Sequence, residues 1–315
     1  MKVDLKSDAD HHKAVLQALL VTFLWSTSWV FIKIGLVEIR PLSFAGLRYG
    51  LAFLCMLPIF VRRRQYRQLS GLPRNTWGLL ALLGIIYYAA TQGAQFVALA
   101  YLPAVSVNLI LTFTTIIVAL SGMVFLAERP TARQWLGILI AIGGAVVYFY
   151  PVSLPEGVAI GLIAGGVAVV ANSVSSVLGR RVNSDPRLSP LTVTVVSMGI
   201  GSLLLAVVGL SIEGLPPVTF RNVLIITWLA VVNTAFAFTL WNHTLQTLDA
   251  FESSVINNTM MIQIPILAII FLGERLTASE FAGLGIAILG TLLVQFSRRR
   301  KQRDNVNKMA VGASD

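Results

Sequence analysis

The segment LAERPTARQWLGILIAIGGAVVY (Leu126–Tyr148) recurs later in the chain as LGERLTASEFAGLGIAILGTLLV (Leu272–Val294). At this offset of 146 residues, 10 of the 23 aligned positions are identical. Shared apolarity explains the matches among isoleucines and leucines, but it does not explain an aligned polar E-R-x-T-A between two apolar runs. The sequence therefore contains an internal repeat, and a repeat of this kind constrains the fold before any element is assigned.

The composition is that of a protein whose surface faces lipid. Of the 315 residues, 56% are hydrophobic and only 12% are charged, and the mean hydropathy is +0.78. Soluble domains carry about 25% charged residues. The net charge of +10 arises from basic clusters between apolar runs, a pattern that orients membrane proteins. We therefore expect an integral membrane protein whose partner is the lipid bilayer, with no nucleic-acid partner.

The apolar runs predict ten membrane-spanning helices. A spanning helix needs about 20 mostly apolar residues, and helix-stopping prolines such as those at Arg40-Pro41 and Pro216-Pro217 separate the runs. The runs are 14–36, 43–61, 76–100, 104–127, 134–150, 157–179, 190–212, 221–246, 250–273 and 280–297.

The repeat offset spans five runs. Because five is odd, the second copy must enter the membrane in the opposite sense to the first. We predict an all-α fold of two inverted five-helix repeats, 14–150 and 157–297, between an N-terminal tail (1–13) and a basic C-terminal tail (298–315). Inverted repeats in known transporters place the substrate site near the midplane, between the halves.

The basic residues predict the orientation. If the N-terminus is cytoplasmic and all ten runs span, 19 of the 24 lysines and arginines fall on the cytoplasmic side. A count of nine or eleven helices would put one basic end outside. We expect both termini in the cytoplasm, and a multi-pass protein of a bacterial-type inner membrane. The polar N-terminus carries no cleavable signal pattern.

Several motifs resemble one family. They are FLWSTSWVFIKIGL in the first run, PLSFAGLRYGLAF in the second, FTLWNHTLQ in the eighth, and the elbows LAERPTARQWLG and LGERLTASEFAG. Together they resemble the EamA family of the drug/metabolite transporter superfamily over nearly the whole chain. The resemblance implies ten helices, a central cavity, and export of amino acids or related metabolites. Among subgroups, the chain looks most like the YddG-type aromatic amino-acid exporters.

One departure from the family concerns helix kinks. The family often carries a proline early in the fourth and ninth helices, where this chain has Thr115 and Met261, and Pro265 appears later in the ninth helix only. A kink that depends on that proline is expected to be shifted, or absent from the first half.

The remaining structural or gating candidates are charged. They are Arg48, at the family's second-helix arginine position, and the elbow pairs Glu128-Arg129 and Glu274-Arg275. We interpret the elbow pairs as structural, with Thr131 and Thr277 as caps of the helices that follow; gating is the alternative role.

The sequence argues against an enzyme, a bound cofactor or a metal. It has no phosphate-binding G-x-x-x-x-G-K-[ST] loop. All 14 acidic residues lie in tails, loops or helix ends, so no carboxylate relay of the kind common in proton-coupled carriers is available. His243 is the one histidine in a membrane run and the one conventional titrating candidate; its alternative role is a hydrogen-bonding residue near the cytoplasmic end of its helix.

The predicted cavity is nearly neutral. Phosphorylated substrates are bound by lysine and arginine, and only Lys33 and Arg48 come close, both toward the outer ends of their helices. Arg48 is expected either to snorkel or to pair with Glu38. A neutral cavity favours a zwitterion or an uncharged solute.

Polar and aromatic side chains inside the runs are the candidates for a substrate site. Polar mid-span candidates fall on the first, third, fourth, sixth, eighth and ninth runs, and the other four runs contain almost no amides. Since a buried amide in lipid is costly unless paired, these six helices should share a polar interior, although any single amide has helix–helix bonding as its alternative role. The candidates are Trp25, Ser26, Tyr88, Gln92, Gln95, Asn108, Thr112, Asn172, Asn233, Trp241, Asn242, His243 and Asn258.

The predicted function is a secondary transporter that exports amino acids, with an aromatic or hydrophobic preference, or related small metabolites by alternating access. The alternatives are a multidrug or other metabolite exporter of the same superfamily and, from other classes, a lipid scramblase, a channel or a membrane-embedded enzyme. The expected ligand is a small molecule, and the protein is expected to be a monomer or a homodimer.

Overall fold

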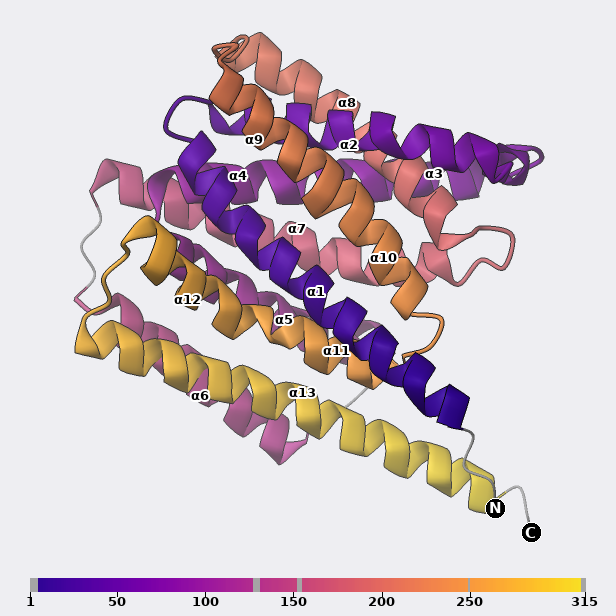
Figure 1. Ribbon diagram of the computed structural model, residues 1–315. Helices are drawn as coiled ribbons and strands as arrows, with labels where there is room; N and C mark the ends of the chain where they lie inside the picture. Colours follow the sequence, from indigo (N-terminus) through magenta and orange to yellow (C-terminus); the bar gives the residue numbers. More distant parts are fainter. Residues whose placement is uncertain (1–4, 127–130, 152–154, 249, 313–315) are drawn as a thin grey trace. The chain divides into compact units, whose positions relative to one another are not determined.

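Every element described in the computed structural model is a helix (Figure 1). The structure describes the backbone of residues 5–126, 131–151, 155–248 and 250–312, and the side chains of 11–118, 120, 131–151, 155–248 and 252–296. The helices are α1 (Leu5–Gly35), α2 (Pro41–Arg62), η1 (Gln65–Leu69), α3 (Arg74–Leu83), η2 (Gly84–Thr91), α4 (Gln92–Tyr101), α5 (Ala104–Leu126), α6 (Ala132–Phe149), α7 (Glu156–Asn183), α8 (Pro190–Glu213), α9 (Phe220–Ala230), η3 (Val231–Phe236), α10 (Ala237–Thr244), α11 (Ala250–Asn258), α12 (Met260–Leu272) and α13 (Ala278–Gly312).

Within the described residues, nine helical segments are long and apolar enough to cross a membrane. Two of them, Arg74–Tyr101 and Phe220–Thr244, join α helices through η2 and η3. A third, Glu252–Leu272, contains the break between α11 and α12. The predicted run 104–127 is α5, of which the stretch Ala104–Val118 is apolar and described. The multi-pass all-helical class is confirmed, and the count of ten stays a prediction.

The helix limits differ from the prediction at several places. Helix α1 begins at Leu5 and α13 ends at Gly312, inside the segments predicted to be tails. The ninth predicted run is broken at Thr259, six residues before the buried Pro265, whereas α5 in the first half is continuous. Apolar periodicity does not report such breaks, because the side chains on both sides of a break are equally apolar.

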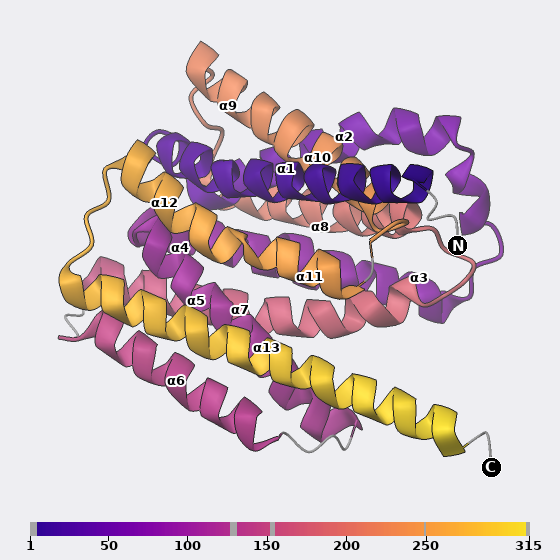
Figure 2. The same cartoon turned by 60° about the horizontal axis from the view of Figure 1, so that its bottom comes forward.

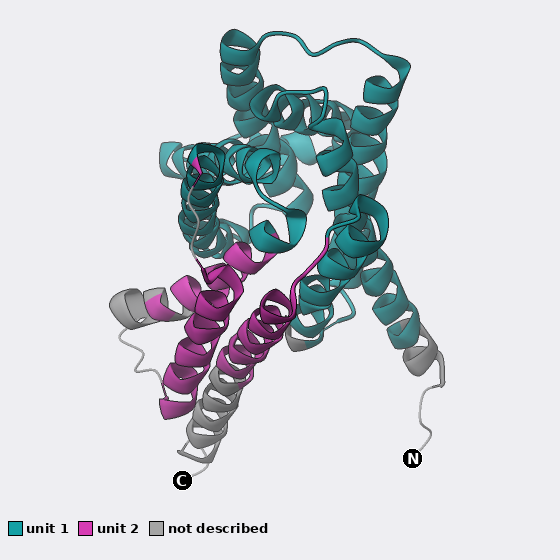
Figure 3. Cartoon of the chain, turned by 90° about the vertical axis from the view of Figure 1, so that its left-hand side faces the viewer, with its two compact units in different colours: residues 1–107, 156–274 teal, residues 108–155, 275–315 magenta. Residues whose placement is uncertain are grey.

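The described chain divides into two compact units, coloured separately in Figure 3. Unit 1 comprises residues 1–107 and 156–274, and unit 2 comprises residues 108–155 and 275–315. Unit 2 therefore holds most of α5 together with α6 and α13, and unit 1 holds the other helices.

In unit 2, α13 lies beside α6 over the length of α6 (Figure 2). A Cβ atom on Gly144 would stand 2.4 Å from the Ala287 backbone nitrogen, and one on Gly290 would stand 2.4 Å from the Ala141 nitrogen. Gly144 and Gly290 are repeat mates, so each helix presents the same glycine to the other. The partners run antiparallel, as an inverted repeat predicts, and glycines let the two backbones touch.

In unit 1, α2 and α8 pack in the same manner. Gly46 of α2 approaches the backbone of Ala206, and Gly209 of α8 approaches the backbone at Leu42. As the residue number rises along α2 it falls along α8, so these helices are also antiparallel. They are the second and seventh runs of the sequence, which occupy matching places in the two copies of the repeat.

In both halves, side chains accept hydrogen bonds from backbone N–H groups at a helix start. The Thr131 hydroxyl accepts from the Gln134 backbone N–H at 3.3 Å, and the Gln134 side chain accepts in return from the Thr131 N–H at 2.8 Å. Thr277 and Glu280 form the same reciprocal pair at the start of α13. Both predicted caps are therefore confirmed, and each is a capping box.

The elbow glutamate Glu274 caps a helix distant in sequence. Its carboxylate accepts from the backbone N–H groups of Ala104 at 2.6 Å and Val105 at 3.1 Å, the first residues of α5. A carboxylate is favourable there because free N–H groups and the positive end of the helix dipole meet at that point. Arg275 is exposed. The predicted pair Glu128-Arg129 lies outside the described residues.

A glycine pair tests the α6–α13 contact. Gly144→Ala should lower the melting temperature of the purified protein, because the new Cβ meets backbone atoms of α13 that cannot move aside; such overpacking costs about 1–3 kcal/mol. Gly143→Ala is the matched control, since nothing lies within 4 Å of its Cβ position. It should be neutral or stabilising, because alanine favours a helix over glycine. Equal melting temperatures for the two variants would contradict the described packing.

Candidate substrate site

Two wide helical turns mark the interior of unit 1. Segments η2 and η3 are π-helical and nearly match under the repeat offset of 146 residues. In each, a threonine hydroxyl donates to the carbonyl five residues earlier, from Thr91 to Ile86 at 2.9 Å and from Thr234 to Leu229 at 2.8 Å. Such π turns occur often at functional sites, because the extra residue re-aims neighbouring side chains.

An aromatic group lies between α1 and α10. The Trp25 ring is 5.3 Å from the Trp241 ring and 5.4 Å from the Phe238 ring, measured between centroids. The indole Nε1 of Trp25 is buried and has no hydrogen-bond partner in the structure. A buried donor without an acceptor costs about 1–3 kcal/mol, so this N–H is available to a ligand.

Asn233 lies beside this group, on η3. Its side chain is fully buried, and its amide N–H₂ donates to the carbonyl of Leu24 and to the Thr27 hydroxyl at 3.1 Å. The amide oxygen has no partner in the structure. The same short segment of α1 thus borders one buried donor, on Trp25, and one buried acceptor, on Asn233.

Ser26 takes part in a ladder between α1 and α12. Its hydroxyl is 2.9 Å from the Gln263 carbonyl oxygen, and the Gln263 amide N–H₂ donates to Thr259 at 2.9 Å. Thr259 in turn is 3.4 Å from Thr22. The ladder crosses the break between α11 and α12. Ser26 therefore bonds one helix to another, which is the alternative role that the sequence left open for each polar residue.

Arg48 does not pair with Glu38, contrary to one expectation from the sequence. Glu38 binds Arg221 at 3.3 Å and the Asn222 amide at 2.9 Å instead. Nor does Arg48 snorkel, since its side chain is buried, with 5% exposed. Its Nε donates to the Thr234 hydroxyl at 3.2 Å, and its guanidinium carbon lies 5.1 Å from the Tyr49 ring centre.

Lys33, the other cation in a membrane run that the sequence singled out, already has two hydrogen-bond partners. The Lys33 ammonium donates to the carbonyls of Leu99 and Leu102, both at 2.6 Å. These groups close the C-terminal end of α4, where free carbonyls and the negative end of the helix dipole favour a cation. Lys33 thus stabilises a helix end, and Arg48 does not.

Three aromatic rings connect Arg48 to a pocket. The Tyr49 hydroxyl donates to the Gln92 carbonyl at 2.7 Å. The Tyr49 ring packs edge-on against Tyr88 with 5.6 Å between centroids, and Tyr88 packs against Tyr87 at 4.8 Å. Tyr87 and Tyr88 line the pocket, so this row of rings begins at a buried cation and ends at an open space.

The pocket has a volume of about 240 Å³. It lies in unit 1 among η2, α7, α8 and α10 and has aromatic and polar walls. Phe238, which contacts Trp25, also lines it, so the pocket borders the aromatic group as well. Its other lining residues are Leu83, Ser175, Ser176, Gly179, Asn183, Val193, Thr194 and Ser197.

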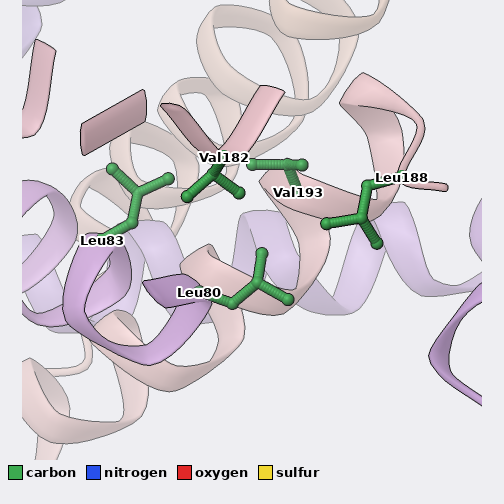
Figure 4. Close-up of a cluster of buried hydrophobic side chains, with 5 residues drawn as sticks. All are labelled: Leu80, Leu83, Val182, Leu188 and Val193. Carbon is green, nitrogen blue, oxygen red and sulfur yellow. The ribbon is translucent and has the colours of Figure 1, made fainter. Parts of the chain in front are cut away.

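An apolar cluster (Figure 4) shares Leu83 and Val193 with the lining of the pocket. It consists of Leu80, Leu83, Val182, Leu188 and Val193, from α3, α7, α8 and the loop before α8. In that loop, Arg187 holds Asp185 with hydrogen bonds at 2.6 and 2.8 Å. These bonds lower the pKa of the Asp185 carboxyl to about 2.

A second, larger hollow has a different character. It is a groove of about 880 Å³ along α2, α8 and α9, lined almost wholly by leucine, isoleucine, valine, phenylalanine and glycine. Such walls resemble the lipid-facing surface of a membrane protein and offer few polar groups to orient a solute. The smaller pocket is therefore the better candidate.

The other predicted residues lie in several places. Gln95 on α4, Asn172 on α7 and Asn242 on α10 are half-buried, as is Asn258 at the end of α11. His243 on α10 is exposed. Asn108 and Thr112 lie on the part of α5 that belongs to unit 2.

Sequence reasoning missed four residues that the structure brings into the interior. They are Tyr49, Thr234, Thr259 and Gln263. Gln263 could have been predicted from the sequence, because it is an amide inside the ninth apolar run. Tyr49 follows Arg48 on a helix with no interior amide, so the distribution of amides pointed away from that helix.

Comparisons with known proteins give a consistent picture. The profile of the EamA-like transporter family matches residues 12–150 and again 159–296. The uncharacterized transporter YyaM of Bacillus subtilis is 28% identical over 80% of this chain and 83% of its own length. A protein of Escherichia coli named as a probable amino-acid metabolite efflux pump is 24% identical over 90% of this chain and 94% of its own length.

A solved structure also matches, described only as the crystal structure of a protein. Its TM-score is 0.63 at 18% identity, and the match covers 91% of this chain and 99% of that chain. At this identity the likeness shows the fold alone.

A double-mutant cycle tests the link between Tyr49 and Gln92. Tyr49→Phe keeps the ring but leaves the buried Gln92 oxygen without its donor, so it should destabilise the protein by about 1–3 kcal/mol. Gln92→Met should cost a similar amount. The double variant should cost less than the sum, because no unpaired polar atom remains. Melting temperatures of the four proteins give the coupling, and strict additivity would contradict the bond.

Proposed function

The chain belongs to the EamA-like transporter family, and from this premise we propose that it is a secondary transporter that exports amino acids or related small metabolites by alternating access. The names of its relatives, which are transporters and efflux pumps, support a membrane transporter rather than an enzyme. The solute class is supported by the E. coli relative, whose name specifies amino-acid metabolites.

The proposed topology has ten spans with both termini in the cytoplasm. Helix α5 supplies the tenth span, since its 23 residues are enough to cross about 30 Å of hydrocarbon. The repeats 14–150 and 157–297 then enter the membrane in opposite senses, in agreement with the antiparallel pairing of α6 with α13 and of α2 with α8.

The observation that carries the proposal is the pair of unpartnered buried atoms beside aromatic rings. Among the described residues, Trp25 Nε1 is a donor without an acceptor, and Asn233 Oδ1 is an acceptor without a donor. A zwitterion supplies the complements of both, since its carboxylate accepts and its ammonium donates. The rings of Trp25, Trp241 and Phe238 give an apolar or aromatic side chain a wall to pack against, which is the basis for an aromatic or hydrophobic preference.

The size of the pocket supports a small solute. Pockets for drug-sized molecules measure about 300–1,000 Å³, and this one is about 240 Å³. A multidrug exporter for organic cations would also favour a buried carboxylate, and the sequence places no acidic residue in the middle of a span. A metabolite of amino-acid size therefore fits better than a bulky cation.

In an alternating-access carrier, a barrier must close the substrate site on one side of the membrane, and the apolar cluster at the pocket is a candidate for it. Leu80, Val182 and Leu188 stand where α3 and α7 meet the loops that the basic residues place in the cytoplasm. A solute that leaves the cell must pass this end first. We therefore assign the cluster as the inner barrier, which separates when the carrier opens to the cytoplasm.

Counterflow in proteoliposomes tests the proposal. Vesicles that hold only purified protein are preloaded with each of the twenty amino acids in turn, and entry of the labelled form is measured. At least one amino acid should exchange with saturation. Trp241→Ala should lower this exchange about tenfold or more, through loss of the aromatic wall, and Asn172→Ala should weaken it.

Trp135→Ala is the matched control, because Trp135 is exposed on α6 in unit 2. It should leave exchange unchanged. If none of the amino acids exchanges in the wild-type vesicles, the proposed solute class is wrong. If Trp241→Ala and Trp135→Ala behave alike, the site lies elsewhere.

A further inference from the structure

We propose that Arg48 binds the carboxylate of the exported solute and is the principal determinant of its chemical class. The inference rests on the proposed function, because it concerns the solute of the same carrier. It adds an anchor that the sequence had assigned only to structure or gating, on a helix that its amide content had excluded from the interior.

The first step is the charge of Arg48. Its side chain is buried in a membrane-spanning helix, and an arginine keeps its proton in such surroundings. The ion pairs among the described side chains are His11–Glu252, Arg187–Asp185 and Arg221–Glu38, so Arg48 has no counter-ion there. Burial of an unneutralised ion costs several kcal/mol, and such residues in membrane spans mark binding sites or pathways.

The second step is the geometry of the guanidinium. Its one hydrogen bond to the described residues goes from Nε to Thr234. The rings of Tyr49 and Phe96 lie 5.1 and 6.0 Å from its central carbon and stabilise the cation without neutralising it. The two terminal nitrogens are left with donors in a planar fork, which matches the two oxygens of a carboxylate.

The third step is the surroundings of Thr234. The preceding residue is Asn233, whose buried amide oxygen lacks a donor. Thr234, which accepts from the guanidinium, and Asn233, whose oxygen has no donor among the described residues, are thus consecutive residues of η3. An amino acid presents the opposite pair, a carboxylate and an ammonium. Lys33 differs from Arg48, because its ammonium already donates to two backbone carbonyls.

Matched acid and amide ligands test the proposal without any need for transport. The probes are L-phenylalanine with L-phenylalaninamide, L-leucine with L-leucinamide, and phenylacetate with phenylacetamide. The readout is the melting temperature of the purified full-length protein as each probe is titrated. For at least one pair, the wild type should respond to the acid at a concentration about tenfold or more below that of the amide, as a charged hydrogen-bonded pair implies.

Arg48→Gln should bring the acid and the amide to the same concentration, chiefly by weakening the acid. Arg48→Lys keeps the charge but loses the fork, so it should keep only part of the preference. Arg62→Gln, at the exposed end of the same helix, is the control and should keep all of it. If Arg48→Gln fails to fold, the acid-over-amide preference of Arg48→Lys tests the proposal instead.

Three results would overturn the proposal. One is a folded Arg48→Gln protein, or Arg48→Lys if that alone folds, with the full wild-type preference. Another is equal loss of acid and amide in such a variant, which indicates a structural role. The last is a wild type that responds to no carboxylate of the panel. A response to phenylacetate but to neither amino acid would instead leave Arg48 as the anchor and overturn amino acids as the solute.

Discussion

The structure depends on one constraint, which is that a bilayer offers no water to hydrogen-bond the backbone. Helices meet it along their length, but their ends do not, and here side chains from other helices supply the missing partners. Glu274 receives the first N–H groups of α5, and Lys33 covers the last carbonyls of α4. Glu213 serves the start of α2, where it accepts from Ser43 at 2.7 Å. These side chains bind one helix to the end of another, so the same bonds that satisfy the backbone also hold the bundle together.

A second consequence follows from the repeat. When a helix packs antiparallel against its repeat mate, matching positions of the two helices have equivalent surroundings. A small residue that is needed at a position of one helix is therefore needed at the same position of the other. This explains why Gly144 and Gly290 are both glycine, although the four positions that follow them differ between the two copies. Close backbone contact in that pair leaves little room for large polar side chains between the two helices, and most of the amides inside the apolar runs fall on other helices.

The sequence predicted those features that depend on composition and local pattern. Apolar length predicted the nine spans found among the described residues, and a threonine before an apolar run predicted the caps at Thr131 and Thr277. It did not predict η2 and η3, because a π turn differs from an α turn by one backbone register and leaves the apolar pattern intact. The partner of Arg48 was also predicted wrongly, because long-range contacts cannot be inferred from nearness in sequence. Glu38 is near in sequence, but a long-range contact with Arg221 takes it, and Arg48 faces Thr234 instead.

The electrostatics of Arg48 bear on how a carrier can bind firmly and still release its solute. A permanent carboxylate partner would neutralise the arginine but would compete with the solute for the same donors. Aromatic rings such as Tyr49 and Phe96 stabilise the cation through their faces and leave its N–H groups free. The empty site therefore retains a charge that is costly in a bilayer, and an arriving carboxylate removes that cost. The attraction between the arginine and the carboxylate is therefore strongest where water is excluded. In the proposed cycle, opening of the carrier readmits water, which weakens the pair and favours release, so Arg48 serves both the binding and the release of the solute.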